Sequence, residues 1–132
     1  MTSSPRRVEP PSGGTPPPTQ AAFDGRDVLL LPLAEAICRR YRDEFRDEEE
    51  RYGDAGLAWC VHDLQWILWW AGEDDLGPNV AWLARVLAAR EFPVARLARA
   101  LDLAADAVDD ELGSTGEAAA ELRRQAEALR AA

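Results

Sequence analysis

Hydrophobic residues recur with helical spacing along most of the chain, most densely between residues 57 and 72. On an α-helix, at about 100° per residue, the aliphatic residues of this stretch share one arc roughly 120° wide, as a core-facing stripe does. These residues are Leu57, Cys60, Val61, Leu64, Ile67, Leu68 and Ala71. The opposite arc, here called the tryptophan face, consists of Trp59, His62, Trp66, Trp69 and Trp70. Because both sides of this helix are apolar, both must be covered.

The same spacing predicts five helices, at 32–52, 54–72, 78–91, 93–112 and 115–131. Pro32 suits the first turn of a helix, while Gly53 and Gly113 mark helix ends. Ser114 and Glu117 form a capping-box pattern at the start of the last helix. The loops are short and no long strand alternation occurs, so residues 23–132 are expected to form one all-α domain, a compact antiparallel bundle of four to five helices.

Charges in the predicted helix 93–112 oppose its dipole. Arg96 and Arg99 lie early in the helix, and Asp106, Asp109 and Asp110 lie late. Such an arrangement costs a few tenths to about 1 kcal/mol per terminal charge. We therefore expect compensating partners on other helices.

Residues 1–22 are rich in proline and glycine. A segment of this composition buries too little apolar area to offset its ordering entropy, which predicts a disordered, partly polyproline II tail. The PPPTQ run within it suits either a solubilising tether or a ligand for a groove-type domain.

Composition excludes several classes of function. The 132 residues carry a net charge of −9 and all fifteen basic residues are arginine. An acidic chain lacks the clustered cations that nucleic acids and anionic membranes require, and a chain without lysine has no P-loop or Schiff-base lysine. Because no apolar run reaches the roughly 18 residues of a membrane span and no signal-peptide pattern opens the chain, a cytoplasmic location is expected. Cys38 and Cys60 are expected to be reduced and buried, with a single disulfide as the alternative.

The sequence contains few residues that suit catalysis or metal binding. His62 is the only histidine, and it lies about 160° around the helix from Cys60, so one metal ion does not readily take both. The acidic residues between 43 and 50 are interpreted as a solvated helix surface rather than a metal site. His62 with Asp63 or Glu73 could perform acid–base chemistry, although a structural histidine explains the same pattern. We predict no catalytic residue, no metal ligand and no required cofactor.

The tryptophan face has three interpretations: a core surface covered by other helices, a contact surface for a second copy or another protein, or a pocket for a planar tetrapyrrole or flavin with His62 beside it. We predict a non-enzymatic interaction or regulatory module that docks through Trp59, Trp66, Trp70 and Trp82, with Arg85 at the rim. A cofactor-binding sensor using His62 is the alternative function, and a small helical enzyme using His62 as acid or base is the third.

Overall fold

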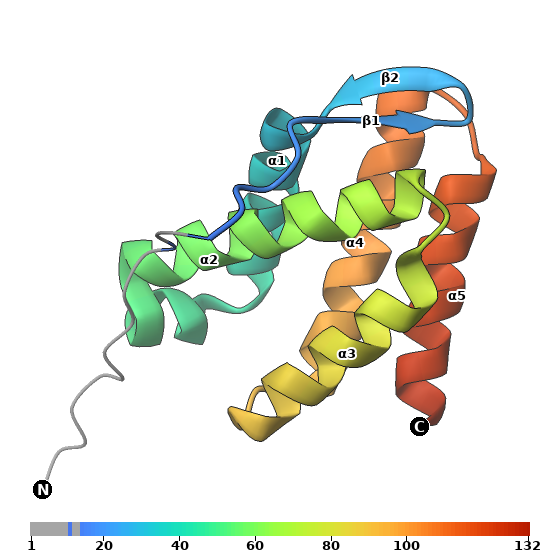
Figure 1. The fold of residues 1–132 in the computed structure, drawn as a ribbon. Coiled ribbons are helices and arrows are strands. Elements are labelled where there is room, and N and C mark those ends of the chain that lie inside the picture. Colours follow the sequence, from blue (N-terminus) through green and yellow to red (C-terminus); the bar gives the residue numbers. More distant parts are fainter. Residues whose placement is uncertain (1–10, 12–13) are drawn as a thin grey trace, which may run out of the picture.

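The computed structural model describes residues 11 and 14–132, which fold into one hairpin and five helices (Figure 1). The elements are β1 (Gln20–Phe23), β2 (Arg26–Leu29), α1 (Leu30–Glu44), α2 (Arg46–Gly72), α3 (Leu76–Ala89), α4 (Val94–Leu112) and α5 (Glu117–Ala131). The predicted all-α class is confirmed, with a small hairpin added. None of the described helices is long and apolar enough to cross a bilayer.

The N-terminal boundary of the domain lies earlier than predicted. Residues 20–22, expected in the disordered tail, belong to β1, which pairs with β2 in antiparallel register from Gln20 opposite Leu29 to Phe23 opposite Arg26. An Asp-Gly turn joins the strands, with positive φ at Asp24 and Gly25, as a tight hairpin requires. Residues 14–19 form neither helix nor strand, and the rest of the predicted tail, residues 1–10 and 12–13, lies outside the described residues.

The predicted helix 32–52 is wrong at its C-terminal end. Helix α1 stops at Glu44, Phe45 has a non-helical conformation, and a new helix begins at Arg46. Helix α2 is itself interrupted at Gly53, whose φ of 61° favours glycine. No glycine or proline breaks the chain at Phe45; instead the Phe45 ring packs 4.8 Å from the Tyr41 ring and 4.4 Å from the guanidinium of Arg96 on α4. The interruption of the helix at Phe45 thus coincides with contacts of its ring to α1 and α4.

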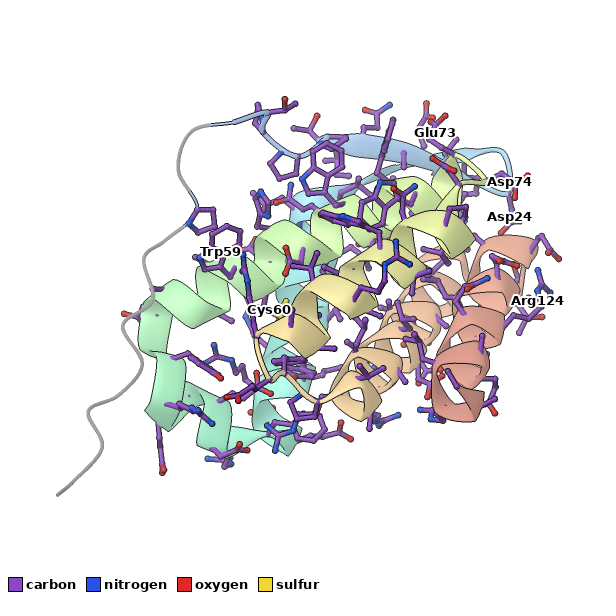
Figure 2. All side chains as sticks on the ribbon, turned by 60° about the horizontal axis from the view of Figure 1, so that its bottom comes forward. Asp24, Trp59, Cys60, Glu73, Asp74 and Arg124 are labelled. Atoms are coloured by element: carbon purple, nitrogen blue, oxygen red, sulfur yellow. The ribbon has the colours of Figure 1, made fainter. Side chains whose placement is uncertain are left out.

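The start of α5 also differs from the prediction. The helix begins at Glu117, and Ser114 does not cap it. Asp24 lies in the hairpin turn near the start of α5 (Figure 2). Its carboxylate accepts a hydrogen bond from the Glu117 backbone N–H at 3.1 Å. A Cβ atom on Gly116 would lie 2.2 Å from Asp24 Oδ2, so the approach depends on glycine. A residue 93 positions away therefore replaces the local capping box.

One continuous apolar core joins all seven elements. Its largest fully buried side chains include Phe23, Leu30, Ile37, Ile67, Leu68, Leu76, Leu101 and Leu122. The hairpin contributes Ala21, Phe23 and Val28 to this core. The aliphatic arc of α2 is accordingly the side that faces the core, with Leu64, Ile67, Leu68 and Ala71 buried.

Helix α4 has the ion-pair partners that its reversed charges predict. Near its start, Arg96 contacts Asp47 and Glu48, each at 2.8 Å, and Arg99 contacts Glu44 at 2.7 Å. Near its end, Asp106 and Asp109 both contact Arg123 of α5, each at 2.9 Å. These contacts compensate the unfavourable dipole interaction and join α4 to its neighbours.

Candidate functional site

The tryptophan face of α2 meets α3 in a groove of about 340 Å³, here called the tryptophan groove. Helix α2 contributes Trp59, His62, Asp63, Trp66 and Trp70, and helix α3 contributes Trp82, Leu83, Val86 and Leu87. Arg90, directly after the end of α3, completes the lining. The four α2 tryptophans are half-buried, while Trp82 is 52% exposed. The fold therefore covers the tryptophan face only in part.

Five of the six predicted site residues line this groove, and Trp69 does not. Trp69 packs against the core and meets Trp66 edge-on, with the ring centroids 5.9 Å apart. Trp66 lies 6.2 Å from Trp70 and Trp59 lies 5.1 Å from His62, measured between ring centroids. The predicted rim residue Arg85 is exposed and does not line the groove, whereas Arg90 does.

His62 has a carboxylate neighbour in the groove. Its Nδ1 lies 3.3 Å from Asp63 Oδ1. Burial raises the pKa of Asp63, and the nearby His62 and Arg90 oppose part of that rise. Glu73, the other predicted partner, is exposed after the end of α2 and does not line the groove.

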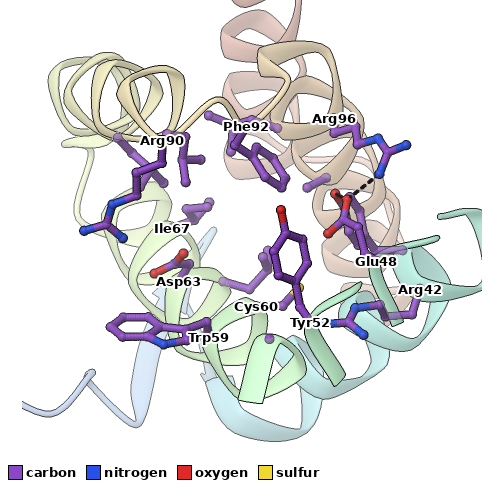
Figure 3. Close-up of a pocket in the computed structure, with 17 residues that line it drawn as sticks. Arg42, Glu48, Tyr52, Trp59, Cys60, Asp63, Ile67, Arg90, Phe92 and Arg96 are labelled. Carbon is purple, nitrogen blue, oxygen red and sulfur yellow. Dashed lines mark hydrogen bonds and ion pairs between the residues drawn. The ribbon is translucent and has the colours of Figure 1, made fainter. Parts of the chain in front are cut away.

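A second and larger hollow, here called the deep cavity, adjoins the groove (Figure 3). Its volume is about 510 Å³, and residues of α1, α2, α3 and α4, together with the short loop after α3, line it. The two hollows share Trp59, Asp63, Leu83, Leu87 and Arg90. Cys60, Leu64 and Ile67 of the aliphatic arc line the deep cavity rather than the groove.

Glu48 is the centre of a polar cluster at one side of the deep cavity. This side chain, in a residue only 6% exposed, accepts hydrogen bonds from the Tyr41 hydroxyl and from Arg96 Nη1, the latter at 2.8 Å. Burial, followed by the contact with Glu48, raises the pKa of Tyr41 well above its ordinary value. The cluster holds the first turn of α2 against α1 and α4.

Arg42 lies on the same side of the cavity and is 7% exposed. Its Nη2 donates a long hydrogen bond of 3.4 Å to the Gly53 carbonyl, and its buried Nε has no partner among the described residues. A Cβ atom on Gly56 would lie 2.9 Å from Arg42 Nη2 and 2.3 Å from Tyr52 Cβ. The missing side chain at Gly56 therefore leaves room for this guanidinium, while Gly53 adopts the positive φ of the kink.

The two cysteines lie against each other at this cavity. Cys38 of α1 is buried and Cys60 of α2 is half-buried, and both are free thiols. The neighbouring Cys60 thiol, followed by burial, raises the pKa of Cys38 above that of an ordinary cysteine. Cys60, but not Cys38, lines the cavity.

Sequence reasoning named five of the ten residues that line the groove but missed the deep cavity. Tyr52, Arg90, Phe92 and Arg96 meet there from distant parts of the chain. Gly53 and Gly56 are the local signal, because two glycines three residues apart weaken a helix and admit close contacts. Comparison of this chain with protein-family models, curated proteins and solved structures finds no match, so its function must be inferred from the two hollows themselves.

Proposed function

We propose that this protein is a non-enzymatic binding module that docks an apolar protein surface in the tryptophan groove. The observation that supports the proposal is the convergence of Trp59, Trp66, Trp70 and Trp82 from two helices on one groove, with Trp82 half exposed. Tryptophan supplies a large contact area and is enriched among the residues that dominate binding energy at interfaces.

The partner to test first is a second copy of the chain. Copies with a net charge of −9 repel each other, so they can meet only where few charges are buried. His62, Asp63 and Arg90 are the titratable groups that line the groove, and its other lining residues are apolar. A two-fold axis would place the groove of one copy against that of the other.

Sedimentation of the full-length chain over a range of concentrations tests this proposal. We expect reversible dimerisation that Trp82→Ala weakens about tenfold or more, because loss of an interface anchor costs about 2 kcal/mol. Trp66→Ala is expected to weaken association while the bundle stays helical by circular dichroism.

Leu29→Ala is the matched control, since Leu29 is 63% exposed on β2 and does not line the groove. A monomer at all concentrations would reject the second copy as the partner. Equal effects of Leu29→Ala and Trp82→Ala would show that the dimer forms elsewhere. Unfolding of Trp66→Ala would assign Trp66 to the core.

A planar cofactor is the second candidate for the groove. His62 favours cofactor binding. Its Nδ1 contacts the Asp63 carboxylate, and its Nε2 makes no hydrogen bond to the described residues. A carboxylate partner of this kind orients histidines that bind metal ions. Titration with haem, hydroxocobalamin or flavin mononucleotide should then change the cofactor absorbance and quench tryptophan fluorescence, and His62→Ala should abolish the haem spectrum. No change with any of the three would reject this candidate.

An enzyme that uses His62 as acid or base is the third candidate. The contact between His62 and Asp63 is compatible with it. In any reaction found for the protein, full activity of His62→Ala would exclude this role.

A further inference from the structure

We propose that the deep cavity binds a small monocarboxylate with an apolar body, and that Arg42 receives the carboxylate. This site is distinct from the tryptophan groove and from the function proposed for it. The inference rests on the charges, the apolar lining and the volume of the cavity.

Arg42 is the cavity cation that lacks an acidic partner. Arg96 is held by Asp47 and Glu48, and Glu48 is further occupied by Tyr41. On the other side of the cavity, Asp63 lies near Arg90 (Figure 3). Asp63 Oδ1 also lies 3.3 Å from His62 Nδ1. Among the described residues, no carboxylate lies within ion-pair distance of Arg42. A buried charge without a counter-charge is unfavourable, so this side of the cavity favours an anion.

The arrangement of Arg42 selects a carboxylate of one charge. The guanidinium offers a planar fork of donors, which matches the two oxygens of a carboxylate. The protein satisfies this guanidinium only in part, because Nη2 makes one long bond to the Gly53 carbonyl and the buried Nε has no partner among the described residues. Because a single guanidinium is available and Glu48 lies nearby, a second negative charge on the ligand would have no partner.

The rest of the cavity suits an apolar body. Leu64, Ile67, Leu83, Leu97 and Ala100 are buried in the core and line the cavity, together with the Phe92 ring. The volume of about 510 Å³ lies within the range of about 300–1,000 Å³ that small-molecule sites occupy. A chain or ring attached to the carboxylate can therefore bury its surface against aliphatic side chains.

Calorimetric titration of the full-length protein with decanoate and with decanol tests the proposal at neutral pH, where only decanoate is charged. We expect decanoate to bind roughly tenfold or more tightly than decanol, as a charged hydrogen bond to Arg42 predicts. Arg42→Gln should remove this preference by weakening decanoate and leaving decanol unchanged. Arg39→Gln, at an exposed position of α1, is the matched control and should behave as wild type.

Cys60 locates the bound ligand without any substitution, because it is the cysteine that lines the cavity. Decanoate should slow alkylation of Cys60 by iodoacetamide. If Arg42→Gln does not fold, the preference of the wild-type protein and the protection of Cys60 decide the question. The proposal is overturned if decanoate does not bind, if it binds no better than decanol, if Arg39→Gln and Arg42→Gln behave alike, or if Cys60 is not protected.

Discussion

Two oppositely charged side chains, Glu48 and Arg42, lie buried beside the deep cavity but differ in how well their neighbours satisfy them. Glu48 accepts hydrogen bonds from a phenol and a guanidinium, whereas Arg42 has one long bond to a carbonyl. A satisfied buried charge holds structure in place, and an unsatisfied one favours an incoming partner. We therefore assign Glu48 a structural role and Arg42 a binding role.

Glu48→Gln should lower the free energy of unfolding by about 1–3 kcal/mol. The amide keeps the shape of the side chain but lacks the negative charge that accepts hydrogen bonds from Tyr41 and Arg96. Urea denaturation monitored by circular dichroism measures the change. Glu49→Gln, the exposed neighbour in the same helical turn, should change little. Equal losses for the two variants would contradict the role of the buried cluster.

Among the secondary-structure elements, the hairpin and α5 depend on each other although they are far apart in sequence. The hairpin turn supplies the Asp24 carboxylate that caps α5, and Arg26 Nη1 donates to the Leu112 carbonyl at 2.9 Å near the end of α4. The hairpin thus satisfies backbone groups at two helix ends that have no partner within their own helices.

Asp24→Gly should lower the free energy of unfolding by less than about 1 kcal/mol, because the loss of the capping carboxylate is partly offset by the ease with which glycine adopts a positive φ. Glycine is the suitable replacement because φ at Asp24 is 50°, which a larger residue rarely adopts. Hydrogen exchange at the Glu117 amide should also accelerate. Ser114→Ala should stay within about 0.5 kcal/mol of wild type. A larger loss of stability would show that Ser114 caps α5 after all.

Across the five helices, ion pairs between elements orient α4. Its start is joined to the α1–α2 corner by Arg96 and Arg99, and its end is joined to α5 by Asp106 and Asp109. Hydrogen bonds from Arg99 and Arg96 lower the pKa values of Glu44 and Asp47, respectively. Both carboxylates are exposed, so solvent screening keeps their contributions modest.

Stability should fall when the pH drops below about 4, the ordinary pKa range of these carboxyl groups. Their folded pKa values are lowered, so the unfolded chain takes up protons first and the ion-pair contribution disappears as pH falls through the folded values. Asp63 acts in the opposite direction because its pKa is raised. Urea midpoints at about pH 7 and about pH 3.5 measure the difference. Arg99→Gln should reduce the change in urea midpoint between the two pH values, and Arg39→Gln should not. An unchanged difference in Arg99→Gln would show that the Arg99–Glu44 pair does not contribute to the pH dependence.

Local periodicity predicts the helices well where each helix has one apolar stripe. The predicted 78–91, 93–112 and 115–131 agree with α3, α4 and α5 to within two residues at each end. The aliphatic arc and the tryptophan face of α2 were likewise visible from spacing alone, since a helix places residues three and four apart on one side. The interruption of the helix at Phe45 was not visible from spacing, because no helix-breaking residue marks it.

The order of residues alone therefore determined which segments are helical, which side of each helix is apolar, and that Trp59, Trp66 and Trp70 share one side of α2. Tertiary packing determined the break at Phe45, the capping of α5 by Asp24, the pairing of Glu48 and the burial of Arg42 beside the deep cavity. The physical reason is range: helical periodicity reports the pattern within one element, whereas these features join residues from separate elements whose contacts local spacing does not encode. The tryptophan groove could be anticipated in part because one helix carries three of its four tryptophans, and the deep cavity could not because four helices form it.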